Sequence, residues 1–321
     1  MKNRKPLPLA FAGLQIHPGE KKRIEIPVSR LPTQTWVSIP VQVIYGEKPG
    51  PCIALISGIH GDEINGMEVM RELVPHLDPK TIRGSIIMVP VVNVFGFLNN
   101  ERYLPDRRDL NRCFPGNPKG SMGARLAHLF TQEILHKADY LIDFHTATVG
   151  RMNYPHVRTN LRLQKNAALA KMFGAEVIMH TSPTEGTLRD AARKYKCQAI
   201  VFEGGGPNVF NNEVIQKAVS GTWSVLQKLK ICMPPKKIKA NPKSKLYKSS
   251  TWVRAHRSGI FRLTENLGDE VEHKQPLGII SNIFGDTIAK VKASQSGTII
   301  GMATDPKVHK GEAIVHIAKT S

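Results

Sequence analysis

The sequence contains few cysteines, and no two of them lie close together. Cys52, Cys113, Cys197 and Cys232 form no CxxC pair. The chain therefore lacks the spacing of a cysteine-based metal site and the density of a disulfide framework. Cys52 and Cys197 lie within or beside apolar runs, which is typical of small core residues. We expect a reducing, cytoplasmic setting.

Long apolar runs are also missing. No hydrophobic stretch reaches the roughly 20 residues that a membrane-spanning helix needs. The apolar patch near the start holds two prolines and precedes no convincing cleavage site, so we interpret it as mature protein. At 321 residues, with 41% hydrophobic and 22% charged residues, the chain can form one large and one small globular domain. We expect no membrane contact.

Acidic residues are scarce. The 26 Asp and Glu stand against 45 Lys and Arg, which gives a net charge of +19. Much of this excess lies in residues 228–248, which hold eight lysines and no acid. The segment lacks the interleaved arginines and aromatics of a nucleic-acid surface, so we interpret it as a solvated linker. The alternative is contact with nucleic acid or anionic lipid, which predicts steeply salt-dependent binding.

The order of apolar patterns predicts an α/β fold. Residues 1–50 alternate in short stretches typical of an opening β segment. After them, near-continuous apolar runs alternate with helical patterns; the runs are 85–92, 140–144, 176–180 and 199–203, and the helices 121–134, 160–173 and 211–230. We predict a three-layer sandwich with a mixed, largely parallel sheet over residues 1–232.

A different pattern follows a basic, proline-bearing linker at 233–248. Residues 249–321 contain short strands, many turns and no good helix, and they repeat. Residues 255–280 parallel 293–317, with Ser-Gly pairs 38 residues apart. Two copies of a small β unit resemble the barrel-sandwich of biotinyl and lipoyl domains. The hairpin between the copies lacks their Met-Lys pair, so we do not expect a swinging-arm carrier.

The stretch LISGIHGDEING, residues 55–66, places polar residues directly after a buried strand. In open α/β sheets, ligands bind outside the carboxyl ends of strands. His60 and Glu63 are three residues apart at a strand–helix junction, so both could face one metal ion. Asp62 is predicted to cap the helix or to support the site from outside. The structural alternative is a plain helix start with His60 incidental.

Two further apolar strands end in polar residues. YLIDFHTA ends at His145, which could be the third metal ligand, with Asp143 holding its imidazole. AIVFEGGGP ends at Glu203, a carboxylate able to take a proton from water and pass it on. Each residue alone could be an ordinary strand-end side chain. Because parallel strands end at one edge, their joint occurrence with His60 and Glu63 favours a site.

The stretch ERYLPDRRDLNRCFPG, residues 101–116, holds four arginines in a loop bounded by Pro and Gly. Guanidinium groups suit bidentate carboxylate recognition, and Asn111 adds an amide. The structural alternative is a surface loop with salt bridges.

Taken in order, these motifs resemble the zinc carboxypeptidase-like hydrolases, and most closely the succinylglutamate desuccinylase/aspartoacylase family. The resemblance covers about residues 50–225, and an appended β domain is also found in that family. It implies one zinc ion held by His60, Glu63 and His145, with Glu203 as general base and acid. Asn111 and Arg112 would bind the substrate carboxylate. Arg102 would polarise the scissile carbonyl, with Arg108 as its competitor, and Arg189 is the candidate for a further substrate-binding arginine.

The resemblance implies a zinc-dependent hydrolase that cleaves the amide bond of an N-acyl amino acid. One alternative is a zinc carboxypeptidase that acts on a short peptide. Another is a basic binding protein with a degenerate hydrolase core. Two His and one Glu suit zinc but fit nickel or cobalt as well. For the C-terminal domain, two roles stay open: narrowing the cleft mouth, or forming the interface of a homo-oligomer.

Overall fold

The structure, a computed structural model, describes residues 7–235 and 243–319. Its strands are β1 (Leu9–Phe11), β2 (Leu14–Ile16), β3 (Lys21–Arg30), β4 (Trp36–Tyr45), β5 (Lys48–Ser57), β6 (Arg83–Val89), β7 (Tyr140–His145), β8 (Arg151–Thr159), β9 (Val177–His180), β10 (Gln198–Gly205), β11 (Lys245–Tyr247), β12 (Ser250–Arg254), β13 (Gly259–Leu263), β14 (Glu270–Val271), β15 (Pro276–Ser281), β16 (Thr287–Lys292), β17 (Gly297–Ala303), β18 (Lys307–Val308) and β19 (Ala313–Lys319). The helices are α1 (Asn65–Leu73), α2 (Val94–Leu98), α3 (Met122–Glu133), α4 (Gln164–Phe173), α5 (Leu188–Lys194) and α6 (Asn212–Lys228), with short 3-10 turns η1 (Val74–His76), η2 (Leu110–Arg112) and η3 (Leu135–Lys137).

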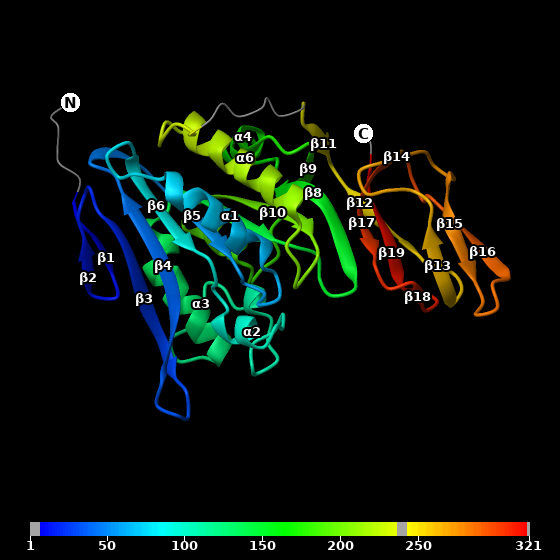
Figure 1. Cartoon of the computed structure of the whole chain (residues 1–321), viewed down its shortest axis with the longest axis horizontal. Coiled ribbons are helices and arrows are strands. Elements are labelled where there is room, and N and C mark those ends of the chain that lie inside the picture. Colours follow the sequence, from blue (N-terminus) through cyan, green and yellow to red (C-terminus); the bar gives the residue numbers. More distant parts are fainter. Residues whose placement is uncertain (1–6, 236–242, 320–321) are drawn as a thin grey trace.

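A large mixed sheet runs through the molecule (Figure 1). Its order is β12-β19-β17-β8-β10-β7-β5-β6-β4-β3, and β9, β11 and β14 attach beside this path. The central strands β6, β5, β7 and β10 are parallel, whereas β3, β4, β8, β17, β19 and β12 pair antiparallel. The sheet is therefore mixed: it is parallel at its centre and again where β9 pairs with β8 and β11, whereas the opening hairpin β3–β4 and the C-terminal strands run antiparallel to their neighbours.

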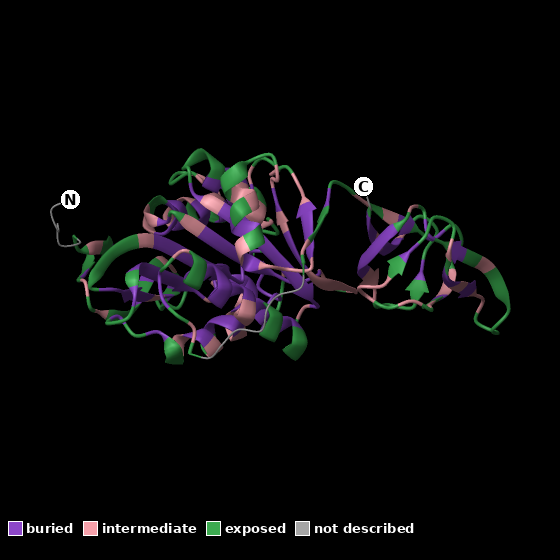
Figure 2. Cartoon of the chain, turned by 90° about the horizontal axis from the view of Figure 1, so that it is seen from above, coloured by how far each residue is buried: buried purple, intermediate pink, exposed green. Residues whose placement is uncertain are grey.

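Helices cover both faces of the central strands. Buried side chains of α1, α4 and α6 pack on one face, and those of α3 and α5 pack on the other. The strands between them are buried on both sides, which explains their continuous apolar sequences (Figure 2). The predicted helix after Ser121 is confirmed, and the Ser121 hydroxyl caps it by accepting the Ala124 N–H.

The C-terminal strands have a core of their own and still join the main sheet. The core side chains include Phe261, Leu277 and Ile314. Strands β16-β15-β13-β18 form a separate sheet, while β17 pairs with β8 of the main sheet. The two sequence repeats exchange strands: Gly259 pairs with Val308, and its counterpart Gly297 pairs with Val271. Classification as a barrel-sandwich stays a prediction.

The last part of the predicted linker at 233–248 belongs to the large sheet. Strand β11 pairs in parallel with β9, so residues 245–247 are structured. Residues 236–242 of this linker lie outside the described residues. Within the described ranges, no helix has both the length and the apolar character to cross a membrane.

Candidate metal centre and active site

The site lies where three parallel strands end. Strands β5, β7 and β10 are neighbours in the sheet, with Ser57 opposite Phe144 and His145 opposite Glu203. This register brings the turn after β5, the end of β7 and the end of β10 to one edge. The sequence argument that distant strand ends meet here is confirmed for these strands.

The turn after β5 is built by glycine. Gly58 has a φ of +64°, which favours a residue without Cβ. A Cβ on Gly61 would lie 1.9 Å from the carbonyl carbon of Gly96, so the two backbones touch. Asp62 does not cap α1, because the cap position is Ile64 and no side chain bonds there. Among the described residues, the buried Asp62 Oδ1 has no hydrogen-bond partner.

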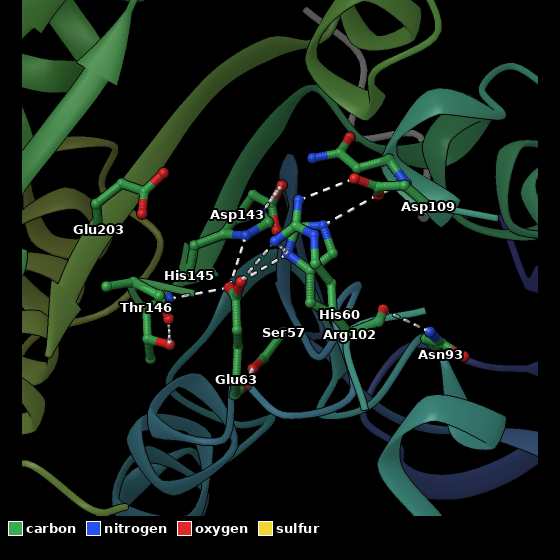
Figure 3. Close-up of polar contacts among 12 residues, drawn as sticks. Ser57, His60, Glu63, Asn93, Arg102, Asp109, Asp143, His145, Thr146 and Glu203 are labelled. Atoms are coloured by element: carbon green, nitrogen blue, oxygen red, sulfur yellow. Dashed lines mark hydrogen bonds and ion pairs between the residues drawn. The ribbon is translucent and has the colours of Figure 1, made fainter. Parts of the chain in front are cut away.

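His60, Glu63 and His145 form a buried cluster suited to a metal ion. One candidate ligand atom from each lies within 4.8 Å of the others. Glu63 Oε1 lies 2.7 Å from His60 Nδ1, and Oε2 lies 2.8 Å from His145 Nδ1 (Figure 3). All three side chains are at most 5% exposed. Two imidazoles and one carboxylate are a ligand set that zinc takes in hydrolases.

Each imidazole is held from behind by an aspartate. His60 Nε2 lies 3.1 Å from Asp109 Oδ1, and His145 Nε2 lies 2.9 Å from Asp143 Oδ2. A carboxylate only accepts, so in both rings Nε2 carries the proton. On the other side of each ring, Nδ1 faces the Glu63 carboxylate, so it would bind a metal once it has released its own proton. A carboxylate behind the ring commonly orients metal-binding histidines in this way.

The charges of this cluster shift its titration strongly. Burial by itself would lower the pKa of His145, but Asp143 and Glu63 outweigh it and raise the pKa well above the usual value. Burial would likewise lower the pKa of His60, which Glu63 and Asp109 raise. Burial opposes ionisation of Glu63, yet His60 and His145 hold its pKa far below normal. Glu63 is therefore a carboxylate at neutral pH.

Arg102 reaches the cluster, whereas Arg108 does not. Arg102 Nη2 donates to Asp109 Oδ2 at 2.8 Å, and Nη1 lies 3.1 Å from His60 Nδ1. Arg102 also lines the cavity above the cluster. Arg108 pairs with Asp106 and its side chain is 61% exposed. It is not among the residues that line the cavity.

Asn111, Arg112 and Arg189 line the same cavity. The Asn111 Oδ1 accepts the Leu188 N–H at 2.9 Å, which ties the arginine-rich loop to the start of α5. Its amide N–H₂ group is the half left for a ligand. Arg189 donates to Thr181, and burial, together with Arg158, lowers its pKa to about 10. Asp109 caps η2 through the Asn111 N–H and so positions Asn111 and Arg112.

Glu203 lies apart from the metal cluster, with both carboxylate oxygens held. In Figure 3, no drawn contact joins it to His60, Glu63 or His145. Arg158 Nη1 donates to Oε1 at 3.1 Å, and Asn153 Nδ2 donates to Oε2 at 3.2 Å. This side chain lines the cavity. These two contacts fix the direction of the carboxylate at the wall of the cavity.

A β-bulge in β8 gives this strand several cavity residues. Glu203 pairs with His156 and Gly205 with Asn153, so three residues of β8 span two of β10. The extra residue changes the alternation, and Asn153 and His156 both line the cavity. His156 Nδ1 donates to the Tyr154 carbonyl at 2.7 Å, and burial lowers its pKa to about 3.

Sequence reasoning missed the β8 residues and two more from the C-terminal strands. Trp252 of β12 and His316 of β19 complete the wall of the cavity, which has a volume of about 330 Å³. Their rings stack at 4.4 Å with planes 8° apart. The available signal was the polar composition of β8, RMNYPHVRT, because the central strands of the chain are apolar. A polar strand beside apolar ones indicates a strand that lines a site.

The chain is similar over nearly its whole length to known deacylases. It is 27% identical to N-alpha-acetyl-L-2,4-diaminobutyric acid deacetylase of Halomonas elongata, over 92% of this chain and 90% of the relative. The solved succinylglutamate desuccinylase/aspartoacylase of Rhodobacter sphaeroides is 25% identical, with a TM-score of 0.82. That match covers 94% of this chain and 95% of the other.

A third similarity supports the fold. The product-bound ectoine utilization protein EutE of Ruegeria pomeroyi is 22% identical, with a TM-score of 0.81, over 94% of this chain and 95% of that one. The model of the succinylglutamate desuccinylase/aspartoacylase catalytic domain matches residues 49–229, which hold the strand-end residues and the arginine-rich loop. The chain therefore belongs to the succinylglutamate desuccinylase/aspartoacylase family.

Proposed function

We propose that the protein is a zinc-dependent hydrolase that cleaves the amide bond of an N-acyl amino acid. One observation carries the proposal: a buried His–Glu–His ligand set and the held carboxylate of Glu203 line one cavity with the Asn111–Arg112 pair. The products are a carboxylic acid and a free amine. All four cysteines are free, which supports the expected reducing setting.

The residues fit one zinc ion. His60, Glu63 and His145 supply three ligands, and the aspartates behind the imidazoles fix the tautomer that binding requires. A zinc site with three protein ligands leaves a position for water or substrate. When bound, the ion polarises the amide carbonyl and lowers the pKa of water.

The remaining steps are assigned to this chain's own residues. Glu203 takes a proton from the attacking water and later gives it to the departing nitrogen, so no covalent intermediate is needed. Arg102 stabilises the negative charge that develops on the carbonyl oxygen. Asn111 and Arg112 bind the substrate carboxylate, and Arg189 adds a further cation to that wall of the cavity.

The experiment is a panel of N-acyl amino acids and short peptides incubated with zinc-loaded protein, with free amine as the readout. N-acetyl and N-succinyl amino acids test the deacylase, and N-acetyl-2,4-diaminobutyrate tests the activity that the Halomonas relative is named for. Cleavage of peptides alone would favour the carboxypeptidase. Absence of stoichiometric zinc, with no cleavage of any compound, would favour a binding protein.

Glu203→Gln tests the assigned base. The amide cannot accept the proton, so kcat should fall by about 10²–10⁴-fold. Zinc content, measured by elemental analysis, should stay at one ion per chain, because the Glu203 side chain bonds to Arg158 and Asn153 and to none of the three ligand side chains. Glu185→Gln, at an exposed position, is the control and should change neither quantity. Full activity of Glu203→Gln would refute the assignment.

A further inference from the structure

The proposed base Glu203 is held by two residues of β8, and these two differ in how firmly they are fixed. Arg158 Nη1 donates to Oε1 at 3.1 Å, and Asn153 Nδ2 donates to Oε2 at 3.2 Å. The Arg158 side chain is 42% exposed, and its long, flexible chain can follow a carboxylate that turns. The shorter Asn153 side chain has few torsions, so its amide follows the position of its backbone. We therefore expect Asn153, rather than Arg158, to decide the direction of the carboxylate.

The backbone of Asn153 is fixed by the sheet from two sides. On one side it pairs with Gly205 of β10, the strand that carries Glu203, and the β-bulge at this point turns the Asn153 side chain toward the cavity. On the other side it pairs with Gly301 of β17, one of the C-terminal strands. The strand of the proposed base and the C-terminal strands therefore meet at Asn153.

Gly301 leaves space for the amide of Asn153. A Cβ at position 301 would lie 3.1 Å from Asn153 Oδ1 and 3.2 Å from the Cβ of His316. The amide oxygen of Asn153 thus lies against β17, while its N–H₂ group points to Glu203. A shift of β17 relative to β8 would move this amide, and the Glu203 oxygen that accepts from it would move too.

We infer that Asn153 is a positioning residue for Glu203, through which the paired C-terminal strands fix the direction of this carboxylate. The inference rests on the proposed function, in which Glu203 transfers a proton between water and the departing nitrogen. A base must lie within hydrogen-bond reach of the proton that it takes, and a misplacement of about 1 Å can cost about 100-fold in rate. The C-terminal strands therefore act on the chemical step as well as on the shape of the cavity.

Asn153→Leu tests the hydrogen bond, because leucine has nearly the shape of asparagine and no donor. With zinc-loaded protein and the N-acyl amino acid cleaved fastest in the substrate panel, we expect kcat to fall by about tenfold to a hundredfold. KM should stay within about twofold, since the lost contact acts on the chemical step and not on substrate binding. Asn153→Gln keeps an amide and should recover part of kcat. Asn166→Ala, on α4, is the control and should change neither constant.

A double variant shows whether Asn153 acts through Glu203. The proposed base is absent from Glu203→Gln, so adding Asn153→Leu should lower kcat by less than about twofold further. Losses that multiply in the double variant would show that Asn153 acts independently of Glu203. A rise of KM in Asn153→Leu without a fall of kcat would show that Asn153 contacts the substrate itself. Either result would overturn the inference.

Gly301→Ala tests the connection to the C-terminal strands. The added Cβ presses on Asn153 Oδ1, so kcat should fall severalfold at unchanged KM. In the Asn153→Leu background the same change should have no further effect on kcat, because leucine cannot pass the shift on to Glu203. Met302→Leu, a volume-conserving change at the next residue of β17, is the control and should leave kcat unchanged. An equal effect of Gly301→Ala in both backgrounds would refute the connection.

Crystal structures keep this inference distinct from the proposed function. The wild type and Asn153→Leu are crystallised without metal or substrate, and the direction of the Glu203 carboxylate is compared. One direction in the wild type, and another or several in the variant, would support the inference even if no compound of the panel is cleaved. The same single direction in both proteins would overturn it, even if the wild type is an active deacylase.

Discussion

At the scale of single residues, the two histidines proposed as metal ligands depend on carboxylates that lie behind their rings. Asp143 and Asp109 each hold one imidazole through Nε2. Asp143 is buried, whereas Asp109 is more exposed and also pairs with Arg102. Loss of the Asp143 carboxylate would therefore leave the Nε2 side of the His145 ring without its acceptor.

Asp143→Asn tests this support. The amide is a weaker acceptor for Nε2–H and can present its N–H₂ group instead, so we expect zinc affinity to fall by about 10- to 100-fold. Competition with a chromophoric chelator measures the affinity. Asp106→Asn neutralises a carboxylate in the arginine-rich loop that contacts none of the ligands, and it should leave the affinity unchanged. Equal affinity of Asp143→Asn and wild type would contradict the supporting role.

The sequence identified the strand-end residues because each strand carries its own signal. His60, His145 and Glu203 each follow an apolar run, and parallel strands end at one edge. It could not select between Arg102 and Arg108, since that choice depends on where a loop folds back. Of the two roles predicted for Asp62, the helix cap is wrong, because the turn continues to Ile64 before α1 begins, and the supporting role stays a prediction.

At the scale of elements, the turn between β5 and α1 is tight because glycine backbone touches glycine backbone. Gly61 lies against Gly96 in the middle of α2, and its N–H donates to the Glu101 carbonyl. This contact joins the turn that carries His60 to the segment that carries Arg102. The glycines of the turn therefore set the distance between His60, a proposed metal ligand, and Arg102.

Gly61→Ala tests the contact. A Cβ 1.9 Å from a backbone carbon forces the two segments apart, so we expect the melting temperature to fall by at least about 4 °C. Differential scanning calorimetry on zinc-loaded protein measures the change. Gly206→Ala is the matched control, because its Cβ would come no closer than 3.2 Å to the end of the flexible Met152 side chain and 3.3 Å to the Arg151 carbonyl oxygen. A similar small change in both variants would refute the steric argument.

The bulge in β8 explains what sequence reasoning could not find. Asn153 and His156 would face opposite sides of a regular strand, since side chains alternate. Only the pairing with β10 shows that one extra residue brings both to the cavity. The sequence also could not show that Trp252 and His316 line the cavity, because they reach it only through the pairing of β17 with β8, a strand far away in the sequence.

The buried His156 predicts a dependence of stability on pH. Above about pH 6.5, the ring is neutral in the folded and unfolded states. Below it, the unfolded chain takes up a proton that the folded chain refuses until about pH 3, so stability falls as the pH falls between these values. His156→Asn keeps a donor for the Tyr154 carbonyl and should show a shallower fall. Thermal melts from pH 7 to pH 4 measure it.

The control for this experiment is His256→Asn, at an exposed position of the C-terminal strands. It should follow the wild-type dependence on pH. If His156→Asn also follows the wild type, the ring is not the group that resists protonation.

At the scale of the whole molecule, the chain carries a net charge of +19, and its cavity is lined by five arginines. A positive field raises the local concentration of an anionic substrate and speeds its encounter with the site. Salt screens this long-range attraction more than it screens the contacts inside the cavity.

The field predicts a salt effect on kcat/KM. For an anionic N-acyl amino acid, kcat/KM should fall severalfold between about 0.02 M and 0.5 M salt, while kcat stays constant. Steady-state kinetics at a series of salt concentrations measures both. The uncharged N-acyl amino acid amide serves as control and should show little change. A matching fall for the amide would point to an effect of salt on the protein itself.

The pairing of β17 with β8 has a consequence for how the protein comes to be active. The paired residues Asn153 and Gly301 are about 150 residues apart in the chain. Closing so long a loop is entropically costly, and contacts of this kind form slowly. During synthesis, the three proposed metal ligands and Glu203 are all made well before β17 exists. The nascent chain can therefore hold its ligand set while one wall of its cavity is still missing, and full activity should wait for the late strands to find β8.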